Sequence, residues 1–246
     1  MINIAFGKNT VLNILESPYF DIRKVILRKE YEKDEKIIKI LEKKNIFYQI
    51  INKDKFSNYN FDKKNQGIVA FIKKYRYSSL NEILEKKKNE KSSLIVILDS
   101  IEDPHNFGAI LRTCSAFKVK GVIISRNNQV PVNNTVIKVS TGGIAHVPIC
   151  KVNNLIKTIE KLKKEKYQII STICNKNSKN YENFSFKNYT CIIFGNENKG
   201  INKKIIDISD YSLYIDVYNK ILSLNVSVTC GIFLSFFSFQ IKKNFF

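Results

Sequence analysis

The sequence of 246 residues has no tryptophan, one methionine, nine glycines and four prolines. So little glycine and proline excludes a collagen-like chain and a protein made mainly of linkers. Hydrophobic residues make up 44% of the sequence, which suffices for a packed core and excludes a disordered basic tail. At roughly 100 to 200 residues per domain, the length allows one or two domains.

Cysteine is also scarce, and its spacing is long. The five cysteines are separated by 36, 24, 17 and 39 residues, so no pair resembles a zinc knuckle or a redox Cys-x-x-Cys motif. We therefore expect no metal site, and reduced, mostly buried thiols in a cytoplasmic protein. The N-terminus shows no signal-peptide pattern. The most apolar stretch, 231–237, is shorter than the ~20 residues of a membrane span, so we expect a buried helix and no membrane partner.

Arginine is rare among the many basic residues. Lys and Arg total 41 against 22 Asp and Glu, a net charge of +19, yet only five of the 41 are Arg. Residues 1–92 carry +9 and residues 93–246 carry +10, so a polyanion such as a nucleic acid fits both halves. Solvated lysine faces without any partner explain the charge equally well. Charge by itself leaves both interpretations open.

Apolar periodicity divides the chain at one polar segment. Residues 1–77 alternate between short strand-like and helix-like pieces, which predicts a small α/β domain. Residues 78–92 are polar, contain a run of lysines and show no strand pattern, so we assign them as a linker. The expected elements of the small domain are strands at 24–27, 46–51 and 67–72 and helices at 10–15 and 32–41.

Residues 93–246 alternate regularly between apolar strands and helical stretches. This order predicts an α/β domain with a parallel sheet, in which ligands bind beyond the carboxyl ends of the strands. The loops of interest therefore follow residues 98, 194 and 215. We expect strands at 94–98, 121–124, 168–170, 191–194 and 213–215, and helices at 153–164, 200–207 and 223–241.

Each of these three loops has an unremarkable explanation when taken alone. The loop 103–109 leads into a helix that carries Arg112, and this is compatible with an ordinary turn and a surface arginine. The loop 195–200 has two glycines five residues apart around Glu197, a pattern that arises by chance. The third loop, 218–223, precedes 223–228, where Ser and Asn suit helix capping. In the apolar helix entered there, Val226, Val228, Ile232 and Phe236 suit a core. Their order and their shared position after strands require a common explanation.

Together, DPHNFGAILRT at 103–113, FGNENKGI at 194–201 and SLNVSV at 223–228 resemble the three signature motifs of the SpoU/TrmH branch of the SPOUT RNA ribose methyltransferases. The resemblance covers about residues 94–240. The N-terminal part, with Gly-Lys-Asn at 7–9 and NQGIVA at 65–70, resembles the small substrate-binding domain of the subgroup that methylates guanosine in 23S rRNA. Shorter tRNA-modifying members of the branch lack this domain.

The resemblance implies an enzyme that transfers the methyl group of S-adenosylmethionine to a ribose 2′-OH of RNA. It also implies a SPOUT-type parallel sheet with a C-terminal trefoil knot, preceded by the small N-terminal α/β domain, and a homodimer. Periodicity gives no indication of the knot. The apolar C-terminal helix with Phe233, Phe236, Phe237 and Phe239 suits a dimer interface as well as a core. RNA, with rRNA first, is the expected partner, and no DNA partner is expected.

The matched motifs assign roles to eight residues of this sequence. Asn106 and Arg112 would face the target nucleotide, and Glu197 would help to order the site. The motif-derived catalytic set is Arg112, Asn106, Glu197, Ser223 and Asn225, where the last two brace the third loop, and the cofactor set is Gly195, Ile215 and Leu224. In the family the arginine is proposed to act as the base. A guanidinium group keeps its proton with a pKa above ~12, so a phosphate contact or a proton relay is an alternative role.

The sequence departs from the family pattern at three places. Residues 215–217 read Ile-Asp-Val where Ile-Pro-Met is usual, and Asp216 brings a negative charge toward a cationic donor. The following glycine is replaced by Asn219, which tolerates the left-handed backbone region. The usual histidine before Gln66 is Asn65.

Three other functions compete with a guanosine methyltransferase of large-subunit rRNA. A tRNA guanosine 2′-O-methyltransferase is disfavoured by the N-terminal domain. A catalytically inactive ribosome-assembly RNA-binding protein is disfavoured because the motif residues Asn106, Arg112, Glu197, Ser223 and Asn225 are all retained. A DNA-binding module has no helix-turn-helix or zinc-finger spacing to support it.

Overall fold

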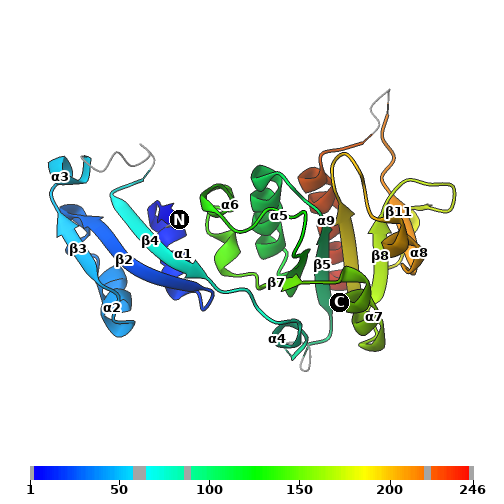
Figure 1. The fold of residues 1–246 in the computed structure, drawn as a ribbon, viewed down its shortest axis with the longest axis horizontal. Helices are drawn as coiled ribbons and strands as arrows, with labels where there is room; N and C mark the ends of the chain where they lie inside the picture. Colours follow the sequence, from blue (N-terminus) through cyan, green and yellow to red (C-terminus); the bar gives the residue numbers. More distant parts are fainter. Residues whose placement is uncertain (1–2, 58–64, 86–89, 219–222, 244–246) are drawn as a thin grey trace.

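The structure, a computed structural model, describes residues 3–57, 65–85, 90–218 and 223–243. These residues form a four-stranded sheet from the N-terminal part and a seven-stranded sheet from the remainder (Figure 1). Every strand pair of the larger sheet is parallel. The predicted fold class, an α/β parallel sheet preceded by a small α/β unit, is confirmed.

The N-terminal unit packs helices on a mixed sheet. Strand β4 is antiparallel to both of its neighbours, whereas β2 and β3 are parallel. Ile37 and Leu41 are buried on one face of α2, as their spacing predicts, and Asp34 caps that helix by accepting from the Ile37 N–H. The strands in spatial order are β1 (Asn3–Phe6), β4 (Ile68–Tyr75), β2 (Phe20–Arg28) and β3 (Tyr48–Ile51), with helices α1 (Lys8–Glu16), α2 (Glu35–Lys43) and α3 (Lys53–Ser57).

The larger sheet is covered by helices on both faces. Alternate residues of β5 belong to two different hydrophobic clusters: Val96 packs with α5 and α9, and Ile97 packs with α7 and α8. All seven residues of β5 are buried, as predicted for a strand between two helical layers. In spatial order the strands are β7 (Ile149–Val152), β6 (Gly121–Ser125), β5 (Ser93–Asp99), β10 (Tyr189–Gly195), β8 (Gln168–Thr172), β11 (Tyr211–Tyr214) and β9 (Lys179–Asn180). The helices are α4 (Leu80–Glu85), α5 (Pro104–Ala116), α6 (Asn134–Val139), α7 (Leu155–Lys164), α8 (Lys203–Asp207) and α9 (Val226–Lys243).

Helix α8 is shorter than predicted, because it begins at Lys203 instead of residue 200. Asn196 and Gly200 exchange two backbone hydrogen bonds of 2.9 and 3.0 Å, and this closed turn prevents an earlier start. The segment expected to be a linker contains helix α4. Ile83 of α4 is buried, and a Cβ atom added to Gly121 would lie 2.6 Å from its Cδ1 atom, so α4 packs closely on β6.

Helix α9 buries only part of its apolar surface. Phe233 and Phe237 are buried, whereas Val228 is 51% exposed and Phe239 is 54% exposed. The prediction that Val228 belongs to the core is therefore wrong, since it lies on the outward face of α9. None of the helices in the described ranges is long and apolar enough to cross a membrane. All five cysteines are free thiols, and four of them are buried, as expected; Cys174 is exposed.

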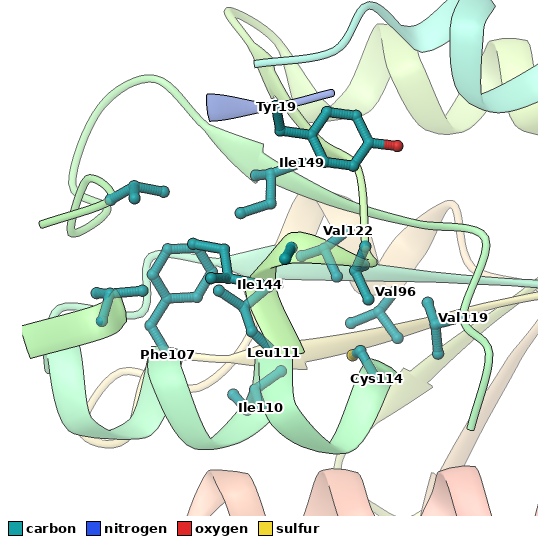
Figure 2. Packing of buried hydrophobic residues seen from close by; sticks show 14 of the residues in the cluster. Tyr19, Val96, Phe107, Ile110, Leu111, Cys114, Val119, Val122, Ile144 and Ile149 are labelled. Atoms are coloured by element: carbon teal, nitrogen blue, oxygen red, sulfur yellow. The ribbon is translucent and has the colours of Figure 1, made fainter. Parts of the chain in front are cut away.

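The N-terminal unit packs directly against the larger domain. The Ile4 N–H donates to Asn134 Oδ1 at 2.8 Å, and Ser17 Oγ donates to the Ala145 carbonyl oxygen at 2.9 Å. Tyr19 is buried near Ile149 of β7, within a hydrophobic cluster that includes residues of both units (Figure 2). This interface fixes β1 beside α6 and the end of α1 beside the turn Gly143–Ala145.

Candidate functional site

The first two motif loops meet at one edge of the larger sheet. Strands β5 and β10 are parallel neighbours, and their last residues, Asp99 and Gly195, lie opposite each other. Asp99 Oδ2 accepts from the Asn202 N–H at 2.8 Å, and Asn196 Nδ2 donates to the Ser100 carbonyl oxygen at 2.7 Å. These bonds join the loop after β5 to the loop after β10.

A hydrogen-bond chain connects all three motifs. Asn106 Nδ2 donates to Glu197 Oε1 at 2.6 Å, and Asn225 Nδ2 donates to Asn106 Oδ1 at 2.9 Å. Asn225 Oδ1 in turn accepts from the Ser227 N–H at 2.9 Å, which caps α9. Asn106 is buried in the middle of this chain. The structure therefore brings together three predicted catalytic residues that are 91 and 119 positions apart.

The turn after β10 requires glycine at its first position. A Cβ atom on Gly195 would lie 2.5 Å from the Gly200 carbonyl oxygen and from the Ile201 nitrogen, both of which are backbone atoms. Gly200 has a φ of +68°, in the left-handed region that favours glycine. The two motif glycines thus allow the turn to close on itself while Glu197 stays exposed at its tip.

A cavity of about 430 Å³ opens beside this turn. Its volume lies within the range of roughly 300 to 1,000 Å³ that is usual for small-molecule sites. The three residues predicted to line a cofactor, Gly195, Ile215 and Leu224, all belong to its wall. Three of the predicted catalytic residues, Glu197, Ser223 and Asn225, line it as well.

Sequence inspection missed one side of this cavity. Thr172, Ile173 and Cys174 line it; Thr172 is the last residue of β8, and the other two follow directly after that strand. Because β8 is the parallel neighbour of β10, its carboxyl end lies at the same edge of the sheet. The position of these residues at the carboxyl end of a parallel strand is the only sequence feature that points to them, because no motif marks this segment. Buried aromatic walls come from Phe194 and Phe233.

Arg112 lies apart from the other predicted site residues. It is on α5, six residues after Asn106, which corresponds to roughly 9 Å along the helix axis. Its side chain is exposed and makes no hydrogen bond or ion pair within the described residues. Arg112 lines a second cavity, of about 570 Å³, between α5, α6 and the N-terminal unit.

The departures at 215–219 have a partial structural explanation. Asp216 is exposed and accepts a hydrogen bond from Asn180 Nδ2, whereas Ile215 and Val217 on either side of it line the first cavity. The negative charge thus forms part of the link to β9 and is not a wall residue. Asn219 lies outside the described residues. Within the parts of the chain that the structure describes, no group of three or more His, Cys, Asp or Glu residues is placed to hold a metal ion.

Two family descriptions match the chain, and together they account for both units. Residues 93–235, more than half of the chain, match the SpoU rRNA Methylase family. The chain belongs to this family. Residues 4–78 match the description RNA 2′-O ribose methyltransferase substrate binding. The prediction that the chain is an RNA methyltransferase of the SpoU/TrmH branch is confirmed by this membership.

Curated relatives of this SpoU-family protein match over most of their length. It is 40% identical over 202 residues to an uncharacterised tRNA/rRNA methyltransferase of Mycoplasma genitalium, covering 81% of this chain and 83% of the relative. It is 34% identical over 216 residues to a putative TrmH family tRNA/rRNA methyltransferase of Staphylococcus aureus, covering 87% and 86%.

Solved structures share the fold of this SpoU-family protein over 97% or more of its length. An rRNA methyltransferase from Sinorhizobium meliloti with bound AdoMet superposes with a TM-score of 0.78 at 20% identity, covering 100% of this chain and 88% of that one. The SpoU methyltransferase AviRb from Streptomyces viridochromogenes, in complex with AdoMet, gives a TM-score of 0.77 at 17% identity, covering 97% and 90%. At these identities the likeness concerns the fold.

Proposed function

We propose that this chain transfers the methyl group of S-adenosylmethionine to a ribose 2′-OH of RNA, with a guanosine of 23S rRNA as the leading target. The observation that carries the proposal is the hydrogen-bond chain from Glu197 through Asn106 to Asn225 beside a cavity of about 430 Å³. This chain holds the three motif loops as one unit around the space in which the donor binds.

The cavity has the shape and chemistry for the donor. S-adenosylmethionine supplies a methyl group already activated on a sulfonium. The tight turn at Gly195 brings its backbone to the cavity wall, while Ile215 and Leu224 offer apolar surface to an adenine ring. Glu197 provides a carboxylate on the same wall, and its Oε2 atom has no hydrogen-bond partner among the described residues. A free carboxylate oxygen at this place favours a cationic ligand.

The remaining motif residues act on the substrate and on the loops. Asn106 and Asn225 hold Glu197 and the start of α9 in fixed positions, which keeps the reacting groups aligned. Ser223 forms the wall of the cavity next to the third loop. Arg112 presents five N–H donors to the RNA from the adjacent cavity and suits a phosphate contact.

The proposal of rRNA as the substrate rests on the presence of the N-terminal unit. Two alternative functions are also considered. The relatives carry names that include both tRNA and rRNA, so a tRNA guanosine 2′-O-methyltransferase is the second candidate. A non-catalytic RNA-binding role in ribosome assembly is the third. We assign residues 1–77 to RNA binding, 78–92 to the connection and 93–246 to methyl transfer.

We further propose a cytoplasmic homodimer with the C-terminal trefoil knot of the SPOUT fold. The exposed apolar side chains of Val228 and Phe239 on α9 support a contact between two copies. The free thiols support a reducing compartment.

Incubation with methyl-labelled S-adenosylmethionine and separate pools of rRNA and tRNA tests the proposed function. We expect label in the 23S rRNA, in a nucleotide whose 3′-phosphodiester bond resists alkaline hydrolysis because its 2′-OH is methylated. Label only in tRNA would favour the second candidate. RNA binding without any label would favour the third.

Thiol labelling tests where the donor binds. Cys174 is the exposed cysteine and lines the first cavity, whereas burial raises the pKa of the Cys150 thiol to about 11 and also raises that of Cys191. Because the thiolate is the reactive form, iodoacetamide should modify Cys174 first. Saturating S-adenosylmethionine should slow this reaction, as measured by peptide mass spectrometry. An unchanged labelling rate would place the donor elsewhere.

A further inference from the structure

A turn between α6 and β7 packs against the helix that carries Arg112. This turn, Gly143–Ala145, is a single turn of 3₁₀ helix, and its last two residues are buried. A Cβ atom added to Gly143 would lie 2.8 Å from Arg112 Cα and 3.3 Å from the Leu111 carbonyl oxygen. Both of these are backbone atoms, so the turn lies directly against the backbone of α5 at Arg112.

The N-terminal unit contacts the same turn through α1. Ser17, the residue after α1, is buried, and its Oγ atom donates to the Ala145 carbonyl oxygen at 2.9 Å. A Cβ atom added to Gly142 would lie 2.6 Å from Asn13 Nδ2 of α1. The turn therefore links α1 of the N-terminal unit to α5 of the larger domain.

The backbone that enters this turn has an unfavourable conformation. Thr141 has a φ of +47° although it is β-branched, and Gly142 follows with a φ of +90°. A β-branched residue adopts the left-handed region only where the surrounding structure imposes it. The Gly143 N–H donates to the carbonyl oxygen of Ser140 at 2.8 Å, and Ser140 is completely buried. The path of the chain into the turn is thus fixed by its surroundings.

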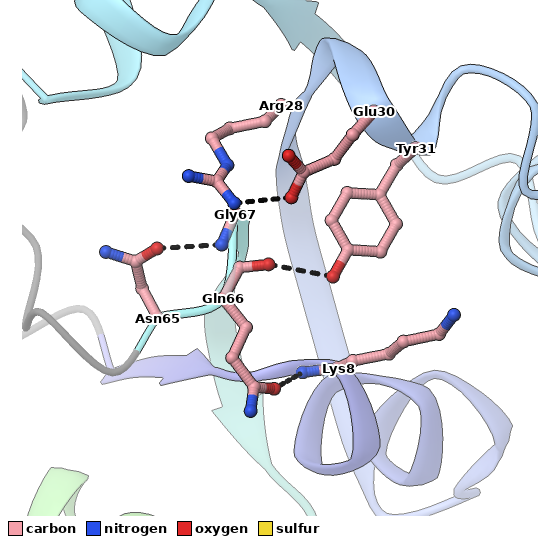
Figure 3. Close-up of polar contacts among 7 residues, drawn as sticks. All are labelled: Lys8, Arg28, Glu30, Tyr31, Asn65, Gln66 and Gly67. Atoms are coloured by element: carbon pink, nitrogen blue, oxygen red, sulfur yellow. Dashed lines mark hydrogen bonds and ion pairs between the residues drawn. The ribbon is translucent and has the colours of Figure 1, made fainter.

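Helix α1 is also held at its first residue (Figure 3). The Lys8 N–H donates to Gln66 Oε1 at 2.8 Å, and the Tyr31 hydroxyl donates to the Gln66 carbonyl oxygen at 2.7 Å. Ser17 provides the bond at the opposite end of the helix. Helix α1 is therefore fixed at both ends, between the turn before β4 and the turn Gly143–Ala145.

We propose that the N-terminal unit positions Arg112 for methyl transfer, with Ser17 and Gly143 as positioning residues that act through the turn Gly143–Ala145. The proposal deepens the proposed function and rests on it. Residues 4–78 match a substrate-binding description, and their contact with the turn gives them a second task. Neither positioning residue lines the first or the second cavity, so neither contacts a ligand in them. Their effect on the reaction passes through the backbone of α5.

Gly143→Ala is the sharpest variant, and Gly231→Ala is its control. The methyl group added at Gly143 meets the backbone at Arg112, so the turn or α5 must shift. At Gly231 in α9 the same group lies no closer than 4.0 Å to Thr113 Cγ2, on the residue next to Arg112. We expect Gly143→Ala to lower the single-turnover rate at saturating RNA by about 10- to 100-fold, because small displacements disturb the alignment of reacting groups. Gly231→Ala should react at the wild-type rate, and both variants should bind S-adenosylmethionine equally.

Ser17→Ala tests the contact from the side of the N-terminal unit. Ser57→Ala is matched to it, since Ser57 Oγ also donates to a backbone carbonyl oxygen, that of Lys53 within α3, at 2.9 Å. Ser17→Ala should lower the rate at saturating RNA by roughly 2- to 10-fold, the effect of one hydrogen bond, whereas Ser57→Ala should not change it. A loss confined to RNA affinity, with the rate at saturating RNA preserved, would assign Ser17 to substrate binding and overturn the proposal.

A double-mutant cycle shows whether Gly143 acts through Arg112. When Arg112→Ala is already present, Gly143→Ala should lower the remaining rate of methyl labelling only slightly, because the side chain that it displaces is absent. Equal fold losses in the wild-type and Arg112→Ala backgrounds would show that the two residues act independently. That result would overturn the proposal.

Hydrogen exchange of α5, measured by mass spectrometry, separates this proposal from the proposed function because it requires no activity. The peptide that contains Arg112 should exchange faster in Gly143→Ala and Ser17→Ala than in their controls. Faster exchange in a protein that methylates no RNA would support the link between the units and refute the proposed function. Wild-type rates of methyl transfer in both variants would overturn the positioning role and leave the proposed function standing.

Discussion

Replacement of Arg112 by alanine is expected to lower the rate of methyl transfer by at least about 100-fold, the usual loss when one preorganised charged donor is removed. The affinity for S-adenosylmethionine should remain close to that of the wild type. The reason is the position of the side chain, which lines the cavity between the two units and not the cavity at Gly195. Single-turnover methyl transfer and calorimetric titration with the donor measure the two quantities.

Two further variants make this result specific. Arg126→Ala is the matched control, because Arg126 is exposed in the same domain and lines neither of these cavities. Arg112→Lys keeps the charge and loses the planar set of donors, so an intermediate rate would indicate bidentate phosphate binding. Turnover near wild type in Arg112→Ala would show that the assignment from the motif is wrong. Loss of donor binding would place Arg112 in the donor site instead.

The sequence predicts best those strands that are buried along their whole length. Strand β5 is apolar along its length because helices cover both of its faces, and the run at 94–98 reflects this directly. Strands β1 and β7, each of four residues, were not predicted. Both are too short for alternation to be distinguished from chance. Helix α8 began later than its apolar pattern because backbone bonds between Asn196 and Gly200 close the preceding turn.

The motifs predict a set of site residues, and the sheet order determines how these residues meet. Asn106 reaches Glu197 because β5 and β10 are neighbours, although nearly a hundred residues separate them in the sequence. The amino-acid sequence pattern does not reveal that β5 pairs with β10, since the order of the strands is set by packing of the whole sheet. The same holds for Cys174, whose place on the cavity wall depends on β8 lying beside β10. The separation of Arg112 from the first cavity likewise follows from the course of α5.

Gly195→Ala should abolish donor binding, because the added Cβ atom meets backbone that cannot yield by rotation of a side chain. It would lie 2.5 Å from the Gly200 carbonyl oxygen and from the Ile201 nitrogen. To relieve this contact the turn must open and break the paired bonds between Asn196 and Gly200, which displaces Glu197 from Asn106. We also expect a loss of stability of roughly 1 to 3 kcal/mol, typical of overpacking.

Gly231→Ala provides the matched control for this glycine. Gly231 lies within α9, and a Cβ atom there would meet nothing closer than Thr113 Cγ2 at 4.0 Å. Alanine is favoured over glycine inside a helix by about 1 kcal/mol, so this variant should melt roughly 2 to 4 °C higher and bind the donor normally. Thermal unfolding and calorimetric titration of both variants measure the contrast. If Gly195→Ala bound S-adenosylmethionine as tightly as Gly231→Ala, the turn after β10 could not form the donor site. The backbone leaves no room for a methyl group at Gly195, so a turn displaced by this substitution would then have no effect on donor binding.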